Sequence, residues 1–383
     1  MKLSGNKGEW GELYIFFKVL IDGKIYAADA DYNRIDSLFL NVLSLIREEV
    51  KGREYKYCTG EVVRIWLNGE HVLDVPKQEF VQQARNIWTE MNRSVQTTFT
   101  VDEIDDFLDK VSITKLKSPS RKTSNYFGGT VDILLEAVTK DNVKRVLGFS
   151  CKTDLTSAST LFNASGDNTN FMYRLIGSVD DEVMDTFNNI YNVRMKNGVE
   201  KKEISVVKRM EYLKRCGVTL MFAKPVKCMT NENLLISGGI EMPIIVGEML
   251  KHFYYDNNSK STTVQECVHY LAKENVVGYS VCDMENIYHI KVANLVYHMF
   301  TGLRFGTKWN GKAEVNGGYI VLKRDGDVVA YHSTIADEFK DFLLSKLRFE
   351  SPSHSRHKDM VIEKIGGKYY LKLALQLRFK MQR

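Results

Sequence analysis

The chain has 383 residues, of which 44% are hydrophobic and 26% charged, a composition typical of folded proteins with a substantial core. The formal net charge is +5, which permits a polyanionic partner without requiring one. The six cysteines show no CxxC spacing and no apolar run is long enough to span a bilayer, which argues against a zinc or disulfide scaffold and against a membrane protein.

The first predicted element is an amphipathic helix from about residue 7 to residue 20, which ends near Gly23. Glu9 and Glu12 lie one turn apart on this helix and therefore share a face. An acidic first turn complements the helix dipole, so a purely structural role is one interpretation. The other is that Glu9 or Glu12 contributes a carboxylate to a catalytic site.

Three further segments precede the centre of the chain. Residues 36–50 have the pattern of a helix, Asn68-Gly69 predicts a hairpin turn, and Pro76 opens another helix. Residues 114–124 then form a basic, polar segment with little hydrophobic content. Its cations are predicted to contact phosphates of a nucleic acid: Lys115, Lys117, Arg121 and Lys122.

Residues 128–152 read as two strands joined by a polar turn. Asp132 opens the first strand, and Ser150 and Lys152 lie on the second. Because alternate residues of a strand project to the same face, Ser150 and Lys152 point together, and pairing of the strands brings Asp132 beside them. A carboxylate next to a lysine at a sheet edge can hold a divalent metal and activate water against a phosphodiester.

The second half of the chain is predicted to be mainly helical, with a C-terminal hairpin that turns at Gly366-Gly367. The segment that follows Lys152 is rich in Ser, Thr and Asn, which either cap local structure or contact DNA; the candidates for contact are Asn163, Ser165 and Asn170. An irregular polar loop before the last hairpin is predicted to contribute Ser353, Ser355, Arg356 and His357 to DNA recognition.

Four segments together resemble the HpaII-type restriction endonucleases. They are NKGEWGELYIFFKVL, the pair DIL and GFSCK, STLFNASGDNTNF, and FESPSHSRHKDM ahead of YYLKLALQLRF. The resemblance spans nearly the whole chain in the same order. It implies an α/β fold with the core of the PD-(D/E)XK nucleases, a central mixed sheet flanked by helices, with helical and β insertions.

The resemblance also implies roles for the residues of the central hairpin. Asp132 matches the metal-binding aspartate of PD-(D/E)XK nucleases, Lys152 matches their lysine, and Ser150 stands where they usually carry a second acid. Glu9, Glu12 or Glu136 is expected to replace that acid. The expected metal ligands are Asp132, the backbone carbonyl of Cys151, and Glu9 or Glu12, with Mg²⁺ as the ion.

The implied activity is double-strand cleavage of a short palindromic DNA site, with CCGG as the expected target. The expected partners are double-stranded DNA and a second copy of the chain, without a membrane or a nucleotide cofactor, in the cytoplasm of a prokaryote. Two domains are expected, with a nuclease core in residues 1–180 and a helical region with the C-terminal hairpin in residues 181–383. The alternatives are a repair nuclease without sequence specificity and a non-catalytic DNA-binding protein.

Overall fold

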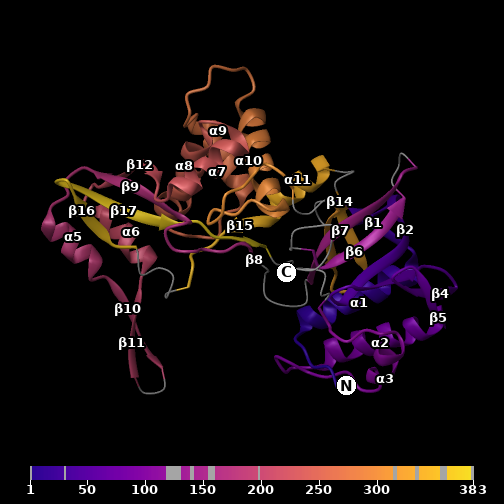
Figure 1. The fold of residues 1–383 in the computed structure, drawn as a ribbon. Helices are drawn as coiled ribbons and strands as arrows, with labels where there is room; N and C mark the ends of the chain where they lie inside the picture. The colour runs from indigo at the N-terminus through magenta and orange to yellow at the C-terminus, as the bar shows by residue number, and fades with distance from the viewer. Residues whose placement is uncertain are drawn as a thin grey trace. The chain divides into compact units, whose positions relative to one another are not determined.

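The computed structural model describes residues 2–29, 32–117, 131–138, 142–153, 160–196, 199–313, 317–332, 336–353 and 360–380 (Figure 1). Its internal contacts divide the chain into two compact units. Unit 1 contains residues 1–159, 313–342 and 381–383, and unit 2 contains residues 160–312 and 343–380.

Unit 1 is built on a nine-stranded sheet with the order β1-β14-β13-β7-β6-β2-β3-β4-β5. Its strands are β1 (Lys24–Ala28), β2 (Arg34–Val50), β3 (Arg53–Cys58), β4 (Val62–Leu67), β5 (Glu70–Pro76), β6 (Ile133–Val138), β7 (Lys144–Thr153), β13 (Gly318–Leu322) and β14 (Val328–His332). The last two strands are far from the others in sequence, so the sheet depends on the return of the chain from unit 2.

The sheet closes on itself through β1, which pairs in parallel with β14 and antiparallel with β2. The six strands β1, β14, β13, β7, β6 and β2 therefore form a barrel-like ring, and β3, β4 and β5 extend from it. The prediction of a helix over residues 36–50 is wrong, because this segment is the long strand β2. Its leucines and glutamates favour a helix, but pairing with β1, β3 and β6 outweighs that local preference.

Helix α1 (Lys7–Asp22) packs against β7 and against α2 (Lys77–Arg93), and the short α3 (Asp105–Lys110) lies nearby (Figure 1). The sequence explains both ends of α1. Asn6 and Glu9 form a capping box, and Gly23 ends the helix in the left-handed region with φ +61°. The predicted helix and its end at Gly23 are confirmed.

Strand β13 runs parallel to β7 and approaches it closely at its start. The N–H of Gly317 donates to the carbonyl of Gly148 at 2.9 Å. A Cβ atom at Gly317 would lie 2.6 Å from that carbonyl oxygen and 2.7 Å from the Phe149 ring. Glycine at position 317 therefore lets β13 pair with β7 alongside the residues that carry the candidate site.

Unit 2 contains a four-stranded sheet with the order β12-β9-β17-β16, a three-stranded sheet with the order β15-β18-β8, and the separate hairpin β10-β11. These strands are β8 (Thr160–Phe162), β9 (Asn170–Ile176), β10 (Tyr191–Lys196), β11 (Val199–Ile204), β12 (Thr219–Pro225), β15 (Leu347–Phe349), β16 (Ile362–Ile365), β17 (Lys368–Ala374) and β18 (Leu377–Phe379). The turns predicted at Gly366-Gly367 and, in unit 1, at Asn68-Gly69 are confirmed.

Unit 2 has helices, as predicted for the second half of the chain, alongside the strands named above. They are α5 (Asp181–Asn188), α6 (Val206–Arg215), α7 (Cys228–Gly238), α8 (Met242–Lys251), the π-helix η1 (His252–Asp256), α9 (Val264–Glu274) and α10 (Met284–Thr301). The division of the chain into units falls within the residues of α11 (Ala336–Lys346). In the described part of the chain no single helix is long and apolar enough to cross a membrane. The bent pair formed by Cys228–Gly238 and Met242–Asp256 meets that test only by length and composition.

Candidate active site

The residues predicted on the central hairpin come together on β6 and β7. Ile133 of β6 pairs with Phe149 of β7, so Asp132, which directly precedes β6, lies beside Ser150. The Asp132 N–H donates to the Phe149 carbonyl at 2.8 Å, which extends the strand pairing by one residue. The local cause is the apolar run that follows Asp132, which builds a buried strand and fixes the position of the aspartate at its start.

Asp132 is only 2% exposed, and β7 orients its carboxylate. Its Oδ2 atom accepts hydrogen bonds from the Ser150 hydroxyl at 2.9 Å and from the Cys151 N–H at 2.8 Å. Two donors on one carboxylate oxygen fix the orientation of the group and support its charge in a buried place. Ser150 therefore acts on Asp132 in this structure and not as a substitute acid.

Lys152 lies at the same end of β7 and lines a pocket of about 180 Å³. Glu12 of α1 lines the same pocket, together with Gly8, Gly11 and Cys151. Asp132 is not among the lining residues, but it is joined to the pocket through its hydrogen bond from Cys151. The pocket thus brings a carboxylate from α1 to the lysine and to the strand residue that contacts Asp132.

The two helix glutamates have different surroundings. The Glu9 carboxylate accepts the Asn6 N–H at 2.9 Å in the capping box and pairs with Lys117 Nζ at 3.2 Å. Glu9 does not line the pocket, whereas Glu12, three residues later, does. Of the two glutamates, Glu12 is the one whose position suits a shared site with Lys152.

Glu136, the third acid considered, belongs to a different cluster on the sheet. Its carboxylate accepts the Ser44 hydroxyl at 2.9 Å and pairs with Lys56 at 2.5 Å and Lys144 at 3.3 Å. Burial raises the pKa of Glu136, but the hydrogen bonds from Lys56 and Ser44 outweigh that effect and lower it overall. This acid therefore links neighbouring strands instead of facing the pocket.

The start of the basic segment is anchored to β2 by a buried ion pair. Arg47 and Glu49 are 2.6 Å apart and almost fully enclosed. Arg47 Nη2 donates to the Lys115 carbonyl at 2.7 Å, and Glu49 accepts the N–H and the hydroxyl of Thr114. The side chains of Lys115 and Lys117 are exposed. Arg121 and Lys122 lie outside the described residues.

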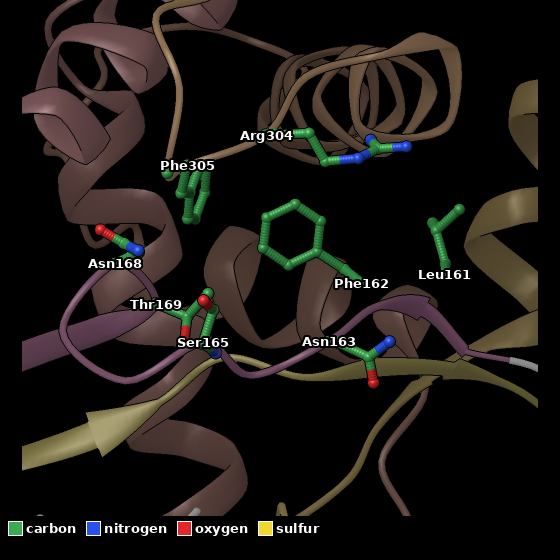
Figure 2. Close-up of a pocket in the computed structure, with 9 residues that line it drawn as sticks. Leu161, Phe162, Asn163, Ser165, Asn168, Thr169, Arg304 and Phe305 are labelled. Carbon is green, nitrogen blue, oxygen red and sulfur yellow. Dashed lines mark hydrogen bonds between the residues drawn. The ribbon is translucent and has the colours of Figure 1, made fainter. Parts of the chain in front are cut away.

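The predicted DNA contacts of unit 2 differ in their exposure. Asn163 and Ser165 are exposed and line a second pocket with Asn168 and Arg304, which the sequence patterns did not single out (Figure 2). Asn170 is only 3% exposed and its amide lies 3.5 Å from Asp167, so its side chain has almost no surface to offer DNA. Ser353 is exposed, while Ser355, Arg356 and His357 lie outside the described residues.

The donor set around Asp132 is small but suits a hard divalent cation. Among the described residues no three His, Cys, Asp or Glu side chains form a metal cluster. Mg²⁺, however, is usually held by one or two carboxylates and completes its shell with water and substrate phosphates. Asp132, Glu12 and the Cys151 carbonyl fit that pattern, since strand geometry directs the N–H and the carbonyl of Cys151 to the same edge of β7, where Asp132 lies.

An aspartate fixed beside β7, and a helix glutamate that shares a pocket with a lysine of that strand, make a site suited to phosphodiester hydrolysis. A sequence model of the HpaII restriction endonuclease family matches residues 6–379, and the chain belongs to this family. It is therefore a type II site-specific endonuclease, an enzyme class that acts on double-stranded DNA and generally needs a divalent metal ion.

One curated relative illustrates the match. The chain is 29% identical over 380 residues to "Type II restriction enzyme HpaII" of Haemophilus parainfluenzae, and the alignment covers 98% of each chain. No solved structure matches this chain.

Proposed function

We propose that this protein makes Mg²⁺-dependent double-strand cuts at a short palindromic DNA site, with a PD-(D/E)XK core formed around β6 and β7. The observation that carries the proposal is the contact of Asp132 with Ser150 and Cys151, beside the pocket that Glu12 and Lys152 share. A buried carboxylate that is fixed in place, on a strand pair that also carries a lysine, suits metal-assisted phosphodiester hydrolysis.

Asp132, Glu12 and the Cys151 carbonyl would hold the metal ion. Bound there, Mg²⁺ would supply a Lewis acid that polarises the phosphoryl oxygen and lowers the pKa of a bound water. Glu9 is the weaker candidate for the same position, because capping of α1 and the pair with Lys117 already engage its carboxylate.

The other residues of the site orient groups and move a proton. The Ser150 hydroxyl keeps the Asp132 carboxylate in one orientation, as partners of metal ligands commonly do. Lys152 orients or deprotonates the attacking water and offsets the charge that develops on the phosphoryl oxygens. Lys152 is thus the residue on which the rate of the chemical step depends most directly.

DNA affinity is proposed to come from exposed cations and polar side chains in both units. Lys115 and Lys117 contact phosphates, and the buried pair Arg47–Glu49 fixes the segment that carries them. Asn163, Ser165 and Ser353 contact the duplex from unit 2. Arg121, Lys122, Ser355, Arg356 and His357 remain part of the proposal from the sequence alone.

The target is proposed to be CCGG, the site implied by the family resemblance, and the acting species a homodimer in the cytoplasm of a prokaryote. A palindromic site is matched by a two-fold dimer with one active site for each strand. Sedimentation of the complex with a palindromic duplex should give two chains per duplex. A single chain per duplex would contradict the proposed dimer but would not contradict the proposed nuclease activity.

Digestion of a plasmid of known sequence tests the activity directly. With Mg²⁺ the protein should give discrete bands whose sequenced ends map to one short palindrome, and EDTA should abolish them. Products without a common sequence would favour a repair nuclease instead. Binding without any Mg²⁺-dependent product would favour a non-catalytic DNA-binding protein.

A further inference from the structure

Unit 2 contains a polar pocket of about 410 Å³, separate from the residues of the candidate active site (Figure 2). Two segments far apart in sequence form it. One is β8 with the turn that follows it, which contributes Phe162, Asn163, Ser165 and Asn168, and the other is the stretch after α10, which contributes Arg304 and Phe305. The volume falls in the range of pockets that bind ligands.

The floor of the pocket is apolar and rigid. Phe162 and Phe305 are 4% and 2% exposed, and their ring centroids lie 4.8 Å apart in an edge-to-face arrangement. Both rings are buried against each other and against their neighbours, so neither exposes a face on which a base could stack. The surface available to a ligand is the polar rim, where Asn163, Ser165 and Arg304 are exposed.

Arg304 is held at the rim by backbone carbonyls. Its Nη1 atom donates to the carbonyls of Met299 and Leu303, both at 2.8 Å. These bonds fix the plane of an exposed guanidinium at the carboxyl end of α10, where the helix dipole also favours a cation. Because Nη1 gives both of its hydrogens to these carbonyls, a flat ligand would pair with the other edge of the guanidinium, through Nε and Nη2.

The opposite side of the rim is equally constrained. The Asn168 carbonyl accepts the Thr230 hydroxyl at 2.8 Å, and Thr169 Oγ1 accepts the Ser165 N–H at 2.7 Å. A Cβ atom at position 306 would lie 3.2 Å from the Asn168 amide nitrogen. Because Gly306 has no side chain, the Asn168 amide fits into the pocket without this close contact. A side-chain amide, as in Asn163 and Asn168, contains both a donor and an acceptor.

We propose that this pocket reads the edge of a base pair in the target duplex and that Arg304 contacts a guanine. The inference rests on the proposed function and extends it to a specificity residue. A phosphate offers only acceptors, whereas this rim combines one cation with amide and hydroxyl groups that both donate and accept. Base edges present that mixture, and arginine pairs with guanine O6 and N7 through its fork.

Selection of bound sequences from a randomised duplex library tests the proposal, with EDTA present so that cleavage does not interfere. Wild-type protein is compared with Arg304→Lys, which keeps the charge but loses the fork, and with Asn163→Ala at an exposed position. Arg215→Lys, an exposed arginine on α6 of the same unit outside the pocket, is the matched control. Thermal unfolding establishes that every variant is folded.

Arg304→Lys should lose roughly five- to hundredfold of its preference at one G·C position, and Asn163→Ala should weaken the same or the adjacent position. Arg215→Lys should select the wild-type sequence. If Arg304→Lys and Arg304→Gln weaken all sequences equally, and Arg304→Gln lowers the salt slope by about one, Arg304 contacts a phosphate and the inference is wrong. Unchanged selection by a folded Arg304→Lys overturns it as well. A wild-type protein without any sequence preference would overturn the proposed function too.

Discussion

At the scale of single residues, the serine at position 150 is the feature that most distinguishes this site from a site with two strand acids. Its hydroxyl donates to Asp132 Oδ2 at 2.9 Å and so belongs to the support of the aspartate. The second carboxylate then has to come from elsewhere, and Glu12 of α1 lines the pocket that Lys152 also lines. We therefore propose one metal ligand directly before β6, Asp132, and one on α1, Glu12.

Ser150→Ala removes one of the two donors to Asp132 and should raise the Mg²⁺ concentration needed for half-maximal cleavage by about tenfold or more, because partners of metal ligands commonly have effects of that size. Ser150→Thr keeps the hydroxyl on a strand that tolerates branched side chains, so it should restore most of the metal response. Cleavage titrated with Mg²⁺ measures both variants. An unchanged titration for Ser150→Ala would show that the hydroxyl does not support the metal site.

Glu12→Gln removes the carboxylate from the pocket with little change in shape and should slow cleavage by about a hundredfold. Glu9→Gln is the matched control on the same helix. It disturbs the capping box and the pair with Lys117 and should lower stability by about 1 kcal/mol while cleavage stays close to wild type. Single-turnover cleavage and urea unfolding of both variants give the comparison. The reverse pattern would assign the catalytic acid to Glu9.

At the scale of elements, Glu136 connects the strands that surround the site, since its three partners lie on β2, β3 and β7. Because the pKa of this carboxyl is lowered in the folded state, its contribution to stability is present above the pKa of the unfolded chain and is lost as the pH falls through the folded value. The stabilisation by the Glu136 carboxylate is therefore present at neutral pH and is lost in acid.

Glu136→Gln should lower the free energy of unfolding at pH 7 by about 1 kcal/mol, which corresponds to roughly 2–4 °C in Tm. The difference from wild type should shrink as the pH falls from the pKa of an ordinary glutamate through the lower pKa of folded Glu136, because the wild-type carboxyl then becomes neutral as well. Melting curves across this pH range test the prediction. If the difference stays constant down to the lowest pH at which both proteins remain folded, the loss comes from packing and not from charge.

Arg209 joins three segments of unit 2 around one buried guanidinium. It donates to the carbonyls of Ile190, Asn188 and Met360, and its guanidinium lies over the ring of Phe187. Arg209→Met should destabilise the protein by about 3 kcal/mol or more, because it leaves buried carbonyls without donors. Arg215→Met, at an exposed position of the same helix, should change stability by less than about 0.5 kcal/mol. Urea unfolding compares them, and equal losses would contradict the role of Arg209.

Local patterns predicted those elements whose cause is local. The helix that ends at Gly23, the turns at Asn68-Gly69 and Gly366-Gly367, and the paired strands that position Asp132 and Lys152 all follow from neighbouring residues. Local patterns did not predict strand β2, because its conformation depends on pairing with three other strands, β1, β3 and β6. The same limit explains why Arg304 was not singled out, since the pocket exists only where the stretch after α10 meets the turn after β8.

At the scale of the whole molecule, unit 1 depends on a segment that the chain supplies late. The parallel pairing of β13 with β7 extends from Gly318 with Phe149 to Leu322 with Thr153, so residues about 170 positions away support the strand that carries Lys152. Parallel partners of this kind need long connections, and unit 2 lies within this one. The candidate site therefore requires the complete fold of unit 1, including its return strands.

Cleavage by Asp132→Ala and Lys152→Ala, measured beside specific DNA binding without metal, tests the central claim most directly. Both variants should cut at least about a hundredfold more slowly than wild type, because each loses a group that stabilises the transition state or holds the metal. Both should still bind the target duplex, which shows that the fold is intact. Cleavage at close to the wild-type rate by either variant would contradict the account of this site.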